Sequence, residues 1–354
     1  MKSSVSLPLL AVLASGTMAQ TPGETSIIKN GMGPVFFLRF SPSGRELARI
    51  CQFGPVELFD TSSYAKARTF SVGMRMVAYS ADGTRMATAE GTDGARVWDS
   101  AAPSRRLPAS SQIVVDELYV LESPFRVLQP PSRDASLRVF WTEFSADGTR
   151  LFTTHANGHV KVWNTKSWTV EDELTVTPAE VRAAAFAPDS TTIVIGDTQG
   201  VLHHWSLENK AETKTWRTQF GAITGVALAP DGKTLVTTHQ SSAERRVMIW
   251  NMTTGRAQIE NGFESAAFSR DGNTLALGGS RIELGEVAPA AWKRTRSIDL
   301  PAIALRDAGR QFANAPNADA KIPVAIGALA FSPDGRILAA GCRDGTVRLV
   351  KLNP

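Results

Sequence analysis

Short stretches of alternating apolar and polar residues run through most of the chain, and tight-turn residues separate them. Near the C-terminus, residues 328–331 (Ala-Leu-Ala-Phe) lead into Ser-Pro-Asp-Gly, and residues 337–341 lead out of it. A second Asp-Gly turn opens residues 346–352, which alternate as a half-buried strand does. Because Asp-Gly supplies the positive-φ positions of a tight hairpin turn, the pattern predicts an all-β fold of antiparallel strands.

The turn recurs in one form: a large apolar residue, a small residue, a variable position, then Asp-Gly or a close variant. Its seven copies begin at Phe40, Tyr79, Phe144, Phe186, Leu228, Phe268 and Phe331. Four of the six intervals are close to the ~40–45 residues of one four-stranded blade, and two are longer by about 20 residues. A blade cannot bury both faces alone, so the blades must stack around a ring. The repeat predicts a seven-bladed β-propeller.

Four of the predicted third strands carry a tryptophan followed by a polar residue. The tryptophans are Trp98, Trp163, Trp205 and Trp250, in Val-Trp-Asp, Val-Trp-Asn, His-Trp-Ser and Ile-Trp-Asn. Together with the seven turns, these segments resemble the WD-repeat β-propeller family over residues 24–354. The resemblance implies a degenerate member whose four tryptophans are structural blade residues, and a scaffold that binds protein or peptide partners. Together with the N-terminal signal pattern described below, it leads us to expect an exported, bacterial member.

The sequence also departs from the family pattern. Phe59 stands where the tryptophan of blade 1 would be, and Val350 stands in the last blade. No histidine occupies the Gly-His position that the family places before a first strand, where it is hydrogen-bonded to the tryptophan strand. We therefore expect the internal polar network to be missing and blade packing to depend mainly on apolar burial.

The last blade lacks an outer strand, because the chain ends on a third strand. Residues 26–29 (Ser-Ile-Ile-Lys) are short and apolar and precede the first blade. We expect this N-terminal strand to complete the last blade and close the ring, which removes two exposed sheet edges.

The N-terminus has the three parts of a secretory signal. Met1-Lys2 is positively charged, residues 5–14 are apolar, and residues 17–19 put small residues at the −3 and −1 positions of a cleavage site. The apolar run is shorter than the ~20 residues of a membrane span. The pattern predicts a signal peptide over residues 1–19 and a protein exported to a periplasm or secreted, with no membrane span.

Charge and motifs exclude several classes of function. The net charge is +4, and the basic residues are scattered among acidic ones, so no nucleic-acid stripe is present. The sequence has no Gly-x-Ser-x-Gly elbow, phosphate loop or His-Glu-x-x-His. We expect a monomer that is not an enzyme and takes no cofactor. The alternative is a lactonase-like hydrolase or a small-ligand binder at the channel mouth, which apolar, small first strands disfavour.

One position near the end of each second strand attracts attention as a possible metal set. Its occupants are Cys51, Glu90, His155, Asp197, His239, Gly279 and Cys342. Equivalent positions are spread around a ring and do not converge, so we expect no metal site. Cys51 and Cys342 fall in neighbouring blades, and a disulfide would suit an exported protein. Equivalent strand positions, however, usually lie farther apart than the ~4.4–6.8 Å between bonded Cα atoms, so both states stay open.

Two insertions account for the long intervals, at residues 103–136 and 301–323. We place them in loops that enter blades 3 and 7 from one rim of the propeller. Long loops on a rigid scaffold often carry binding function, although neutral insertion explains them equally well. The predicted partner contacts are Tyr119, Phe125, Arg126, Arg306 and Phe312.

Overall fold

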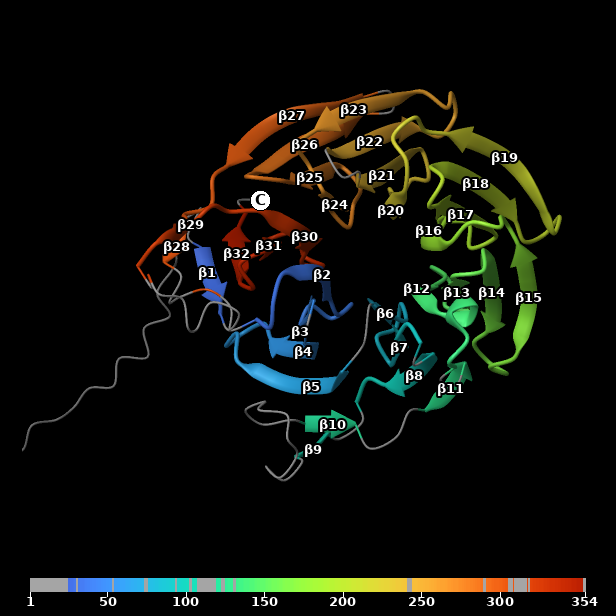
Figure 1. Ribbon diagram of the computed structural model, residues 1–354, viewed down its shortest axis with the longest axis horizontal. Coiled ribbons are helices and arrows are strands. Elements are labelled where there is room, and N and C mark those ends of the chain that lie inside the picture. The colour runs from blue at the N-terminus through green and yellow to red at the C-terminus, as the bar shows by residue number, and fades with distance from the viewer. Residues whose placement is uncertain are drawn as a thin grey trace, which may run out of the picture.

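The computed structural model describes most of the chain after residue 24. The described residues are 25–29, 31–52, 54–72, 76–92, 94–101, 104–106, 119–121, 125–129, 132–240, 244–288, 291–304, 308, 317 and 319–352. Their strands form seven four-stranded antiparallel sheets that follow one another around a ring (Figure 1). This confirms the seven-bladed propeller. No helix in this part of the chain is long and apolar enough to cross a membrane.

Each blade has four antiparallel strands, ordered below from the centre of the ring outward (Figure 1). Blade 1 contains β2 (Val35–Phe40), β3 (Glu46–Cys51), β4 (Pro55–Asp60) and β5 (Lys66–Val72). Blade 2 contains β6 (Met76–Tyr79), β7 (Arg85–Ala89), β8 (Ala95–Asp99) and β11 (Arg126–Gln129). Blade 3 contains β12 (Val139–Phe144), β13 (Arg150–His155), β14 (His159–Asn164) and β15 (Val170–Thr175). Blade 4 contains β16 (Val181–Phe186), β17 (Thr192–Asp197), β18 (Val201–Ser206) and β19 (Ala211–Arg217).

The remaining blades follow the same order. Blade 5 contains β20 (Ile223–Leu228), β21 (Thr234–Gln240), β22 (Arg245–Asn251) and β23 (Ala257–Asn261). Blade 6 contains β24 (Ser265–Phe268), β25 (Thr274–Gly278), β26 (Ile282–Ala288) and β27 (Ala291–Ile298). Blade 7 contains β30 (Ile326–Phe331), β31 (Ile337–Cys342), β32 (Val347–Lys351) and β1 (Thr25–Ile28).

The recurrent Ser-x-Asp-Gly turn joins the first strand of a blade to the second. In blade 3, the Ser145 hydroxyl donates to Asp147 Oδ1 (2.6 Å), which also accepts the Thr149 N–H (3.0 Å). Gly148 follows with φ 71°, a value that favours glycine. All these turns lie at one end of the propeller, here called the lower rim. The end at which the first strands begin and the second strands finish is the upper rim.

The N-terminal strand closes the ring as expected. Strand β1 is the outer strand of blade 7, and its Ile28, which is buried, pairs with Val347 of β32. The segment that follows β1 is bound to blade 1, because Arg49 Nη1 of that blade donates to the Lys29 carbonyl (3.1 Å). The main chain of Gly31 donates to the Gly345 carbonyl (3.1 Å). Blades 1 and 7 are thus joined through one short segment.

The two insertions differ from their expected placement. Residues 126–129 form β11, the outer strand of blade 2, so the first insertion precedes this strand and does not enter blade 3. It leaves β8 at Asp99, which pairs with Arg85 beside the lower-rim turn. The second insertion contains the hairpin of β28 (Ile303–Ala304) and β29 (Lys321–Ile322), between β27 and β30 at the upper rim. The described ends of the two insertions therefore lie at opposite rims.

Candidate functional site

The first strands of the blades surround a central cavity of about 1320 Å³. Five of these strands, in blades 1, 3, 4, 5 and 7, have a register shift at their second residue. Such a bulge re-aims the side chain of its residue. The residues at this position, with Glu264 of blade 6, form the mouth of the cavity: Phe36, Phe140, Arg182, Thr224, Glu264 and Gly327.

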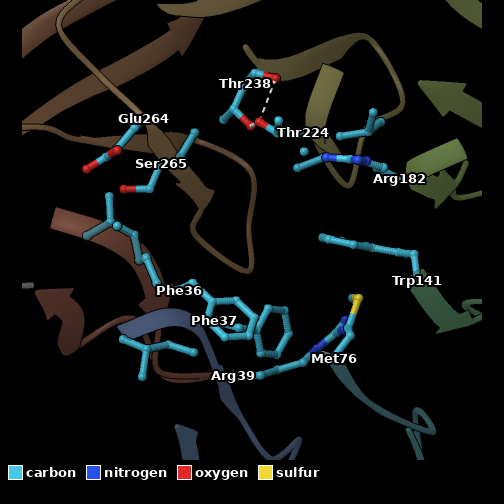
Figure 2. Close-up of a pocket in the computed structure, with 18 of the residues that line it drawn as sticks. Phe36, Phe37, Arg39, Met76, Trp141, Arg182, Thr224, Thr238, Glu264 and Ser265 are labelled. Carbon is cyan, nitrogen blue, oxygen red and sulfur yellow. Dashed lines mark hydrogen bonds between the residues drawn. The ribbon is translucent and has the colours of Figure 1, made fainter. Parts of the chain in front are cut away.

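The cavity wall has large side chains on one side and small ones on the other. Blades 1 to 3 contribute the large side chains of Phe37, Met76 and Trp141, and the rings of Phe37 and Trp141 meet edge to face with centroids 6.3 Å apart. On blades 5 to 7 the corresponding positions carry Gly225, Ser265 and Ala328. Figure 2 shows Phe37, Met76 and Trp141 facing an open space with Ser265 across it. The open space is a slot with one aromatic side.

An ion pair narrows the lower part of the slot. Arg39 of β2 and Glu143 of β12 lie 3.3 Å apart, although blade 2 stands between their strands. They meet because blade 2 has only Ala78 at the equivalent position. Burial raises the pKa of the Glu143 carboxyl, an effect that Arg39 opposes. A charged pair thus crosses the lower channel, while the upper rim stays open.

The mouth carries more positive than negative charge. Glu264 accepts from Arg343 Nε (3.0 Å) and lies 3.0 Å from Arg245 Nε, so two cations share one carboxylate. Arg182 Nε donates to Glu180 (2.9 Å), and its guanidinium stands 5.5 Å from the centre of the Phe140 ring. The expectation of apolar, small first strands therefore holds for blades 5 and 7, but blades 1, 3 and 4 put aromatic and charged groups at the channel.

Groups that could bind metal do not converge in the described part of the chain. No set of three or more His, Cys, Asp or Glu residues there has the arrangement of a metal site. His155 and His239 instead belong to separate blades, 3 and 5.

Both histidines take part in a polar relay that sequence reasoning missed. In blade 3, the Trp163 indole N–H donates to Thr153 Oγ1 (3.1 Å), which lies 3.0 Å from His155 Nε2. Blade 5 repeats this relay with Trp250 and Thr237 (3.0 Å), whose hydroxyl lies 2.8 Å from His239 Nε2. The expected absence of a polar network is therefore wrong.

Blade 2 builds the same relay with a carboxylate in place of the imidazole. Trp98 donates to Thr88 (3.0 Å), and the Thr88 hydroxyl donates to Glu90 (2.6 Å). The sequence pattern that indicates this relay is Thr-x-His or Thr-x-Glu at the end of the second strand. It was overlooked because the family's histidine comes from a different segment. In blade 4, Ile195 replaces the threonine, and the Trp205 N–H is buried without a partner among the described residues.

Blades without the tryptophan contain buried ion pairs instead. Arg49 Nε of blade 1 donates to Glu57 (2.9 Å), and Arg348 Nη2 of blade 7 donates to Asp344 (2.7 Å). Both arginines are almost wholly buried. Arg348 Nη1 also donates to the Pro301 carbonyl (2.8 Å) at the base of the second insertion. Polar pairing therefore contributes to packing in blades on both sides of the ring closure.

Of the five predicted partner contacts, the structure describes the side chains of Phe125 and Arg126. Phe125 is 41% exposed at the lower rim, where the Arg85 guanidinium lies 4.2 Å from its ring centre and that of Arg126 lies 5.5 Å away. The Trp168 ring meets Phe125 edge to face with centroids 5.9 Å apart. The side chain of Tyr119, and the whole of Arg306 and Phe312, lie outside the described residues.

The two cysteines are buried and free. Burial raises the pKa of the Cys51 thiol to about 11 and that of the Cys342 thiol to about 12. Such thiols are protonated and poorly reactive at neutral pH.

The fold is a seven-bladed propeller with a central cavity. The family model of the WD domain, G-beta repeat, matches three segments: residues 132–164, 211–251 and 323–351. These matches fall in blades 3, 5 and 7 and support a relationship with WD-repeat proteins.

Curated relatives are similar to this chain over about a third to a half of its length. Human apoptotic protease-activating factor 1 is 28% identical over 123 residues, 32% of this chain and 10% of that protein. The human U3 small nucleolar RNA-associated protein 4 homolog is 25% identical over 201 residues, 53% of this chain and 26% of that protein. Protein groucho of Drosophila melanogaster is 24% identical over 189 residues, which is 52% of this chain and 23% of that protein. The chain thus spans about a quarter or less of these relatives.

Proposed function

We propose that this protein is a scaffold that binds protein or peptide partners at the upper rim of the propeller. The observation that carries the proposal is the cavity mouth, where Phe36 is 42% exposed and which Phe140 and Arg182 also line. Aromatic residues and arginine are enriched in protein interfaces relative to the rest of the surface. Relatives with WD repeats support a non-enzymatic role of this kind.

Two capture variants test this function. Tagged Phe36→Ala should lose partners that the wild-type chain captures from its native host. Ile259→Ala removes a similarly exposed apolar side chain (39% exposed) on the outer strand of blade 5 and should retain them. Equal capture by wild type, Phe36→Ala and Ile259→Ala would contradict binding at the upper rim.

We also propose that the scaffold acts outside the cytoplasm, as a monomer. The N-terminal signal pattern supports export, and N-terminal sequencing of the mature protein tests it. A mature chain that begins at Gln20 is expected. Retention of Met1 or Lys2 in the mature protein would contradict cleavage.

A small-ligand binder is the second candidate, because a cavity of about 1320 Å³ is large enough to hold a ligand. A lactonase-like hydrolase would need carboxylates or imidazoles that converge near the axis. Among the described residues, the cavity-lining carboxylates Glu143 and Glu264 are each paired with arginine. We therefore favour the scaffold over the enzyme.

A further inference from the structure

The cavity has unbalanced positive charge at the junction of blades 3 and 4. Its lining includes four arginines and two glutamates. Arg39 pairs with Glu143, and Arg343 pairs with Glu264. The other two lining arginines are Arg138, next to β12 of blade 3, and Arg182 in β16 of blade 4, whose partner Glu180 does not line the cavity. Charge complementarity at this place therefore favours an anionic group.

Arg138 is half-buried, and its guanidinium forms no hydrogen bond or ion pair with any described residue. Arg182 has one carboxylate partner, Glu180, two residues away, and 48% of its side chain is exposed. A guanidinium has five N–H donors in a fork that matches a carboxylate. Both arginines thus have donors available to a ligand at the cavity mouth.

The slot beside these arginines suits an apolar side chain. Phe36, Phe37 and Trp141 form its aromatic side, and small residues form the other (Figure 2). The volume of about 1320 Å³ exceeds the ~300–1,000 Å³ of common small-molecule pockets. A peptide segment therefore fits the cavity better than a single metabolite.

We propose that the partner presents an acidic peptide, in which an Asp or Glu carboxylate binds Arg138 and Arg182. A neighbouring aromatic or large aliphatic side chain enters the slot against Phe36 and Trp141. This inference rests on the proposed scaffold function and specifies the chemistry of its partner. Glu180 then competes with the ligand for Arg182, and this competition limits affinity.

Selection from a display library of random heptapeptides tests the proposal on the purified full-length protein. The wild type should enrich sequences with Asp or Glu next to an aromatic or large aliphatic residue. The top synthetic peptide should bind the double variant Arg138→Gln/Arg182→Gln at least about tenfold more weakly, because charge-assisted hydrogen bonds are lost. Arg133→Gln is the matched control, since Arg133 is exposed on the same segment and does not line the cavity.

A second variant gives a change of opposite sign. Glu180→Gln removes the carboxylate beside Arg182 and should tighten binding of the acidic peptide severalfold. Enrichment of Lys- or Arg-rich peptides, or of apolar peptides without acidic residues, would overturn the acidic chemistry and leave the scaffold function standing. Absence of any enriched peptide overturns this proposal, while the Phe36→Ala capture experiment decides the scaffold function separately.

Discussion

At the scale of single residues, threonine hydroxyls connect the blade tryptophans to the ends of the second strands. Thr153 accepts from Trp163 and lies beside His155, so one hydroxyl satisfies two buried partners. A buried polar group left without a partner costs about 1–3 kcal/mol. The relays therefore stabilise the blades in which they occur, and their loss should be measurable in the free energy of unfolding.

Thr153→Val should lower the free energy of unfolding by about 2 kcal/mol, because it keeps the side-chain shape but leaves the Trp163 N–H unpaired. Thr142→Val is the control: Thr142 is buried on the neighbouring strand, and its hydroxyl has no partner among the described residues. This control should be neutral or slightly stabilising. Urea denaturation of both variants measures the difference, and equal destabilisation would show that the relay contributes nothing.

The same histidines make stability depend on pH. Burial lowers the pKa of His155 and of His239 from 6.5 to about 4. The pKa of each histidine is lower in the folded state than in the unfolded state, so protonation favours unfolding. The stability of the fold with neutral histidines is therefore fully present above about pH 6.5 and is lost as the pH falls toward 4. Full protonation of each costs on the order of 3 kcal/mol. His203 opposes the trend, because hydrogen bonds to Asp197 and Glu212 outweigh burial and raise its pKa.

We expect the melting temperature to fall between pH 7 and pH 4.5, and to fall less in His239→Gln, which has no imidazole to protonate in blade 5. Thermal melts at the two pH values measure this. If wild type and His239→Gln lost the same number of degrees, the histidine would not be a source of the acid sensitivity.

At the scale of strands, turns and tryptophans predicted most of the fold. The seven Asp-Gly-type turns and the Trp strands gave the blade count, and the apolar residues 26–29 gave the closing strand. Strand β11 was missed because its four residues follow a long insertion and have no Asp-Gly turn before them. The cavity mouth was missed because a bulge at Phe36 or Phe140 depends on pairing with the second strand, which local alternation does not encode.

The closing strand offers a direct test at this scale. Ile28 is buried in the core shared by blades 1 and 7, and Ile28→Ala should cost about 2–3 kcal/mol of unfolding free energy. Lys29→Ala is the control, because its side chain is exposed while its carbonyl still accepts from Arg49. The control should stay within about 0.5 kcal/mol of wild type. A melt unchanged by Ile28→Ala, or by deletion of residues 24–30, would refute ring closure by this strand.

At the scale of the whole molecule, the ring is closed without a covalent link between its cysteines in this structure. Native protein should therefore react with no thiol reagent, and denatured protein without reductant should show two thiols, Cys51 and Cys342. Detection of two thiols only after reduction would establish a disulfide across the closure instead.

The ring also presents two different rims. The upper rim has the open slot, its aromatic wall and its unbalanced arginines. The lower rim has the hairpin turns and the Phe125–Trp168 pair next to the first insertion. Two phenylalanines of nearly equal exposure, Phe36 (42%) and Phe125 (41%), mark these two ends of the propeller. They therefore provide a matched pair of probes for partner binding.

Site-specific photo-crosslinking tests the central claim most directly. A benzophenone amino acid replaces Phe36 in one protein and Phe125 in another, and each is irradiated with its native-host extract. Partner binding at the upper rim predicts a crosslinked partner from position 36 and none from position 125. Crosslinking from position 125 alone would contradict the account and would place the partner on the lower rim.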